Sequence, residues 1–240
     1  RQIKSELKQL ATLDDGSETI VQLLNDIEQF ESHLPEFRRT ALRKHVSDWL
    51  TTTVASPPGL RIRAFGKPEV YVQGKLIDHA DWKTTAARDM FFCLVAHPDG
   101  LTKEEIGLLL WPDCSPSQLK TRFKNTIYRM RNAIPKDAVV YNNEVYRFNR
   151  QLDYEHDVEL FLGRVGQAKN AINVTMSTQM LRSALDLYRG QYLPTEDALW
   201  AISKRETLRQ TYIEASLELA SLHLESDQPD EALSLCLRIL

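Results

Sequence analysis

The stretch SPSQLKTRFKNTIYRMRNAIP, residues 115–135, carries five cations and no acidic residue, although the whole chain has a formal net charge of -3. If the stretch is helical, its apolar residues share one face, amides and hydroxyls occupy the opposite face, and most of the cations lie at the edges between the two. Cations at the edges can reach DNA phosphates, and amides and hydroxyls between them can hydrogen-bond to base edges in the major groove. The pattern therefore predicts a recognition helix for double-stranded DNA.

The residues of this helix that we predict to contact DNA are Gln118, Lys120, Thr121, Arg122, Lys124, Asn125, Tyr128, Arg129, Arg131 and Asn132. For Tyr128 the alternative is packing against the hairpin that follows, and for the whole helix it is an ordinary solvated surface. The distribution of charge favours DNA binding, because residues 60–150 contain 15 Lys and Arg against 10 Asp and Glu. Residues 1–59 contain 7 against 9, and residues 151–240 contain 8 against 14. Counterion release from the phosphates would make the affinity fall steeply with salt.

Two well-signalled helix starts position the basic helix after a shorter one. In LTKEEIGLLLWP, Thr102 and Glu105 can form a capping box. In SPSQL, Ser115 can cap a helix whose first residue is Pro116, and Gln118 closes a second box. The short WPDC between the two helices predicts a helix-turn-helix, and WKTTAARDMFFCLVAHP predicts a further helix ahead of it.

β-Structure is predicted on both sides of these helices. LRIRAFG, PEVYVQGK and KLIDHA alternate or carry β-favouring residues, which predicts a small antiparallel sheet. After the basic helix, AVVY and VYRF predict a hairpin with a tight turn at Asn142 and Asn143. Asn142, Asn143 and Arg147 are then candidates for contact with the minor groove or the DNA backbone. Sheet, three helices and hairpin together predict a winged-helix DNA-binding domain over residues 60–150.

The sequences on either side of this domain have helical patterns. Residues 1–50 predict a short helical segment, the tail of an upstream domain, and residues 51–59 predict a linker because they contain TTTVASPPG. Residues 151–240 predict amphipathic helices with recurring small residues, typical of a tetratricopeptide-like array that is truncated at residue 240. The expected fold class is mainly α with small β-sheets: a winged helix-turn-helix domain plus a tetratricopeptide-like helical domain.

Catalytic and cofactor motifs are missing from the sequence. It contains no GxxxxGK[ST] or GxGxxG loop and no HExxH, and its six histidines are dispersed. Its three cysteines are too scattered for a disulfide framework or a metal site, which favours a reducing, cytoplasmic compartment. The longest apolar run, MFFCLVA, is far shorter than the roughly 20 residues of a membrane span. We therefore expect no enzymatic activity, no cofactor, no metal and no membrane partner.

Two parts of the sequence resemble known families. Residues 60–148 resemble an OmpR/PhoB-type winged helix, in which YRMRNAI stands where such proteins carry an L-R-x-x-L end to the recognition helix. The continuation, with DVELF, ALDLYRGQYLP, Trp200 and KRETLRQTYIEASLELA, resembles the bacterial transcriptional activation domain (BTAD) of the antibiotic regulatory protein (SARP) family. Together these two parts make up most of the chain.

The resemblance implies a bacterial transcriptional activator that binds direct repeats near a promoter, with the helical domain serving regulation and self-association as a homodimer on DNA. It also implies that the turn formed by Trp111, Pro112 and Asp113 faces RNA polymerase. One departure is Val145, which stands where the family's wing usually has a glycine that relaxes the backbone. The alternative function is a tetratricopeptide-like protein-interaction scaffold without specific DNA binding.

Overall fold

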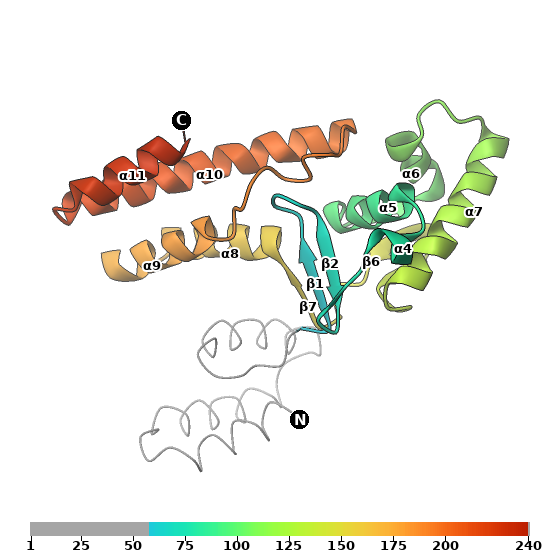
Figure 1. Ribbon diagram of the computed structural model, residues 1–240, viewed down its shortest axis with the longest axis horizontal. Helices are drawn as coiled ribbons and strands as arrows, with labels where there is room; N and C mark the ends of the chain where they lie inside the picture. The colour runs from blue at the N-terminus through green and yellow to red at the C-terminus, as the bar shows by residue number, and fades with distance from the viewer. Residues whose placement is uncertain (1–57, 240) are drawn as a thin grey trace, which may run out of the picture. The chain divides into compact units, whose positions relative to one another are not determined.

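The computed structural model describes residues 58–239 (Figure 1), so the helical segment and most of the linker predicted before residue 60 lie outside the described residues. Within this range a small sheet is followed by four helices, the first of them a single turn, then by a hairpin and four further helices. None of these helices is both long enough and apolar enough to cross a membrane.

The first sheet has the strand order β3-β2-β1-β7. Strands β1 (Leu60–Arg63), β2 (Glu69–Val72) and β3 (Lys75–Leu76) are antiparallel, as expected, but β7 (Tyr154–His156) pairs parallel with β1 and was not predicted. Residues of β1 alternate between buried and half-buried, because one face of the sheet covers the core.

The predicted third strand, KLIDHA, is wrong beyond Leu76. Helix α4 (His79–Trp82) begins instead, with Asp78 as its N-cap. The Asp78 carboxylate accepts a hydrogen bond from the Asp81 backbone N–H at 2.9 Å, and the Asp81 carboxylate accepts one from the Asp78 N–H at 3.1 Å. Two carboxylates at this spacing satisfy the free N–H groups of a helix start, and this local preference outweighs the β-propensity of the apolar residues before it.

Helices α5 (Thr85–Ala96), α6 (Lys103–Leu110) and α7 (Pro116–Ala133) pack against one another beside the first sheet (Figure 1). Helix α5 is the centre of this core, because it contacts α4, α6, α7 and β6. Its fully buried apolar residues are Ala87, Met90, Phe91, Phe92, Cys93, Leu94 and Val95.

A second antiparallel sheet has the order β4-β6-β5, formed by β4 (Leu101–Thr102), β5 (Val139–Asn142) and β6 (Val145–Phe148). Strands β5 and β6 form the predicted hairpin, but its turn lies one residue later than expected. Asn143 and Glu144 have the left-handed φ values of 50° and 62°, whereas Asn142 is the last residue of β5 and pairs with Val145. A two-residue turn with both φ values positive matches the twist of the flanking strands, so the pairing register selects it.

The remaining residues form two antiparallel helix pairs. Helix α8 (Asp157–Lys169) packs on α9 (Val174–Leu185), and α10 (Leu199–Glu225) packs on α11 (Pro229–Ile239). Contacts between α9 and α10 stack the two pairs into consecutive layers (Figure 1). The predicted fold class is confirmed: the chain is mainly α with small sheets, and helical pairs follow the winged helix.

Candidate nucleic-acid interface

Helix α7 begins with the capping box that the sequence predicts. The Ser115 side chain accepts a hydrogen bond from the Gln118 backbone N–H, and Gln118 Oε1 accepts one from the Ser115 N–H at 3.0 Å. Pro116, at the first helical position, lacks the N–H that would otherwise need a partner there. The helix start is therefore fixed by local chemistry, independently of any ligand.

One face of α7 is sealed against the winged-helix core. Phe123, Ile127 and Met130 are at most 9% exposed, and Leu119 is half-buried. The Phe123 ring packs edge-on against Tyr146 of the hairpin, with ring centroids 5.0 Å apart. Because the apolar face packs against the core, the rotation of α7 about its axis is fixed and the opposite face is turned outward.

All the α7 residues predicted to contact DNA are exposed: Gln118, Lys120, Thr121, Arg122, Lys124, Asn125, Tyr128, Arg129, Arg131 and Asn132. Tyr128 is 67% exposed, so the alternative in which it packs against the hairpin is wrong. Within residues 58–239 no hydrogen bond or ion pair engages the side chains of Lys120, Lys124, Arg129 or Arg131. The structure thus brings these residues together on one open surface.

Two of these residues already have partners within the protein. Gln118 Oε1 belongs to the capping box, so its side-chain N–H groups are what remain for a ligand. Arg122 Nη1 donates to Cys114 Sγ at 3.1 Å, and the guanidinium carbon lies 5.6 Å from the centre of the Trp111 ring. Trp111 is half-buried, whereas Pro112 and Asp113 are exposed in the turn between α6 and α7.

The hairpin contributes less to the open surface than the helix does. Asn142 and Asn143 are exposed, but Arg147 is half-buried and its Nε donates to the Asp99 carbonyl at 2.7 Å. This contact holds the hairpin beside Gly100, whose φ is +80° and where an added Cβ would lie 2.3 Å from Arg147 Cγ. Arg147 therefore anchors the hairpin to the α5–β4 loop in addition to any contact with a ligand.

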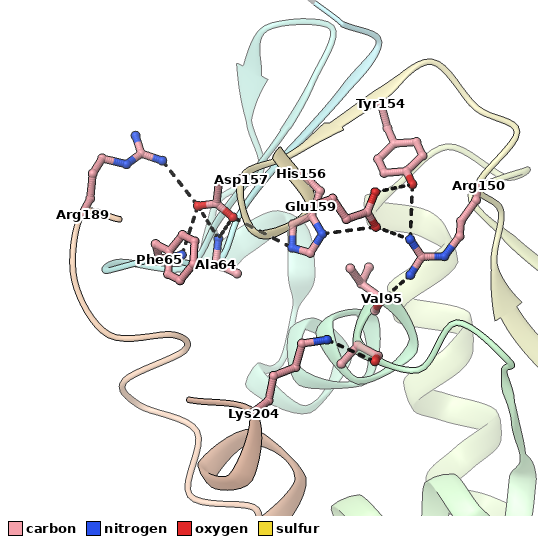
Figure 2. Close-up of polar contacts among 11 residues, drawn as sticks. Ala64, Phe65, Val95, Arg150, Tyr154, His156, Asp157, Glu159, Arg189 and Lys204 are labelled. Atoms are coloured by element: carbon pink, nitrogen blue, oxygen red, sulfur yellow. Dashed lines mark hydrogen bonds and ion pairs between the residues drawn. The ribbon is translucent and has the colours of Figure 1, made fainter. Parts of the chain in front are cut away.

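Sequence reasoning missed a polar junction between the winged helix and the helical pairs, which Figure 2 shows. Asp157, the first residue of α8, is only 4% exposed. Its carboxylate accepts hydrogen bonds from the Ala64 N–H at 2.9 Å and from the Phe65 N–H at 3.0 Å, and it lies 3.5 Å from Arg189 Nη2. One side chain thus joins the end of β1, the start of α8 and the segment after α9.

A second part of the junction surrounds Glu159 (Figure 2). Its carboxylate accepts hydrogen bonds from Arg150 and, at 2.7 Å, from the Tyr154 hydroxyl, and it lies 3.5 Å from His156 Nδ1. Burial by itself would raise the pKa of Glu159, but His156, Arg150 and Tyr154 outweigh it and hold the pKa well below its usual range. Arg150 Nη2 also donates to the Val95 carbonyl at 2.9 Å, which ties the cluster to α5.

Helix α10 completes the junction from the other side. Lys204 Nζ donates to the Ala96 carbonyl at 3.4 Å, at the end of α5, and burial lowers the pKa of this amine. Arg205 Nε donates to the Tyr192 carbonyl at 2.7 Å, which holds the segment before α10 in place. No sequence signal identified these residues, because Asp and Glu in a first helical turn, or Lys and Arg within a helix, are usually solvated.

Residues 58–239 contain no group of three or more His, Cys, Asp or Glu side chains placed to hold a metal ion. Cys93 and His97, one helical turn apart in α5, contact each other instead. The His97 Nδ1 lies 2.7 Å from the Cys93 carbonyl oxygen and 3.9 Å from its sulfur.

Comparisons with known proteins bear on the fold. No protein-family model matches the sequence, and no curated protein matches it significantly. Among solved structures, the chain is similar to Mycobacterium tuberculosis EmbR, solved in complex with a low-affinity phosphopeptide, with a TM-score of 0.62 and 16% sequence identity. The match covers 71% of this chain, which spans 47% of the EmbR chain. A match at this identity shows a shared fold over the matched part of the chain and nothing more.

Proposed function

We propose that the protein is a transcriptional regulator of the SARP type and that residues 60–150 bind double-stranded DNA through α7. One observation carries the proposal: the amide, hydroxyl and cationic side of α7 is exposed over the whole length of the helix, while its apolar side is sealed in the core. The helix itself contains no acidic residue that would repel phosphates.

The exposed residues divide into two roles on this proposal. Lys124, Arg129 and other long cations at the edges neutralise phosphates, which supplies affinity without regard to sequence. Asn125 and Asn132, near the middle of the exposed face, hydrogen-bond to base edges and supply discrimination. The hairpin residues Asn142 and Asn143 contact the adjacent backbone or minor groove.

The wider biological role follows from the resemblance and from the EmbR-like fold, EmbR being itself a regulator of the SARP family. On this basis the protein activates transcription in the bacterial cytoplasm from direct repeats near a promoter, where it forms a homodimer. Its turn at Trp111, Pro112 and Asp113 then faces RNA polymerase, an orientation in keeping with the exposure of Pro112 and Asp113. It has no enzymatic role in this scheme.

Binding to promoter fragments from the neighbourhood of the gene tests the proposal. Lys124→Ala should weaken binding to every sequence and lower the slope of log affinity against log salt by about 0.9. Asn125→Ala should instead reduce the preference for the specific site, by about 1–3 kcal/mol at one base pair. The matched control is Lys169→Ala, an exposed cation in α8, which should change neither quantity. Unchanged binding in both α7 variants would refute DNA recognition by this helix.

The competing function, a protein-interaction scaffold, has one structural feature in its favour. Leu233 and Leu237 of α11 are 58% and 63% exposed, and they lie on one side of the helix. A purified protein that bound no DNA at low salt but bound a protein partner would support the scaffold and contradict the proposal.

A further inference from the structure

Arg122 is the cation of α7 whose side chain has partners within residues 58–239. Its side chain runs back toward the N-terminus of the helix, the direction that helical geometry favours. There its Nη1 donates to Cys114 Sγ at 3.1 Å, and its guanidinium lies 5.6 Å from the centre of the Trp111 ring. The planar guanidinium suits this arrangement, because it can stack on an aromatic face while one edge donates a hydrogen bond.

The two partners stand at opposite ends of the turn between α6 and α7. Trp111 is the C-cap of α6, and Cys114 immediately precedes Ser115, the N-cap of α7. Across the turn itself the Cys114 N–H donates to the Trp111 carbonyl at 3.0 Å, and Pro112 has no N–H to contribute. A side chain from the second turn of α7 therefore bridges both ends of a connection that has few bonds of its own.

Arg129 provides the natural comparison. It lies seven residues after Arg122, on the same edge of α7, and is likewise exposed. Among the described residues, however, no hydrogen bond or ion pair engages its side chain. The same residue type thus occurs twice on one edge, once held by the turn and once available to a ligand.

We propose that Arg122 is a positioning residue that fastens the α6–α7 turn to α7 and does not contact DNA phosphates. This inference rests on the proposed function, which places α7 against DNA, and it gives one of the predicted contact residues a different role. To reach a phosphate, Arg122 would have to leave both the Trp111 ring and the Cys114 sulfur. Arg129 would break no hydrogen bond or ion pair to residues 58–239 on reaching a phosphate.

The first test compares Arg122→Gln with Arg129→Gln in the whole protein, using a random-sequence DNA duplex over a range of salt concentrations. Arg129→Gln should lower the slope of log affinity against log salt by about 0.9, because one phosphate contact is lost. Arg122→Gln should leave this slope unchanged. An equal fall in slope for the two variants would overturn the inference. If neither Arg129→Gln nor Lys124→Gln changed the binding, the proposed function would fail on its own.

The second test needs no DNA. A double-mutant cycle with Arg122→Gln and Trp111→Leu, measured by urea unfolding, should show a coupling of about two- to fivefold in the unfolding constant, as expected for an exposed cation–π pair. The cycle of Arg129→Gln with Trp111→Leu is the control and should show none. Absence of coupling between Arg122 and Trp111 would overturn the inference even if the DNA experiment could not be performed.

Discussion

Replacing Asp157 with Ala should destabilise the described part of the protein more than any surface substitution. Among residues 58–239, the change removes the only acceptor for the backbone N–H groups of Ala64 and Phe65, which are 0% and 2% exposed. Each buried N–H left without a partner costs about 1–3 kcal/mol, so the free energy of unfolding should fall by about 2–6 kcal/mol. Loss of the Arg189 ion pair adds at most about 1 kcal/mol, because the Arg189 side chain is 42% exposed.

Urea unfolding followed by circular dichroism measures this loss. The free energy of unfolding of Asp157→Asn should lie between those of the wild type and Asp157→Ala, because an amide oxygen can still accept a hydrogen bond but carries no charge. Asp186→Ala, at the exposed end of α9, is the matched control and should change the free energy by less than about 0.5 kcal/mol. A loss for Asp157→Ala no larger than that of the control would show that the carboxylate does not hold the junction together.

Three further predictions follow from individual contacts. Gly100→Ala should cost at least about 2 kcal/mol in urea unfolding, because φ is +80° and the added Cβ would meet the hairpin, whereas Gly163→Ala in α8 meets nothing and should be neutral or stabilising. The lowered pKa of Glu159 contributes stability that is present at neutral pH and is lost as the pH falls below 4.5, the usual pKa of a glutamate. The difference in free energy of unfolding between wild type and Glu159→Gln should therefore shrink in acid. A difference independent of pH would contradict this. Burial raises the pKa of the Cys93 thiol to about 12, so maleimide should label Cys114 but not Cys93 in the native protein. Peptide mass spectrometry measures the labelling of each cysteine. Labelling of Cys93 at the rate of Cys114 would be inconsistent with the burial of Cys93.

The features that could be predicted from the sequence are those completed within a few residues. The capping boxes at Thr102 and Ser115 form between residues three positions apart, so their chemistry is visible in the sequence. The box at Asp78 has the same spacing but was missed, because the β-favouring residues before it predicted a strand. The buried and exposed faces of α7 could be predicted for the same reason, because helical periodicity alone places Phe123 and Met130 opposite Asn125 and the cations.

Features that depend on distant partners could not be predicted. Strand β7 is only three residues long and is stabilised by β1, and the N–H groups that donate to the Asp157 carboxylate lie 92 and 93 residues away in the sequence. In the sequence, Asp157 looks like any acidic residue in the first turn of a helix. The contacts of Arg122 were missed because they depend on how the α6–α7 turn folds back, which periodicity does not describe.

The parallel pairing of β7 with β1 decides where this protein can be shortened. A polypeptide cut after residue 150 would lose β7 and with it the neighbour on one side of β1, and the amides of Ala64 and Phe65 would lose their acceptor. Such a fragment would expose an open strand edge, which promotes aggregation. An isolated DNA-binding fragment should therefore extend through β7 and include Asp157.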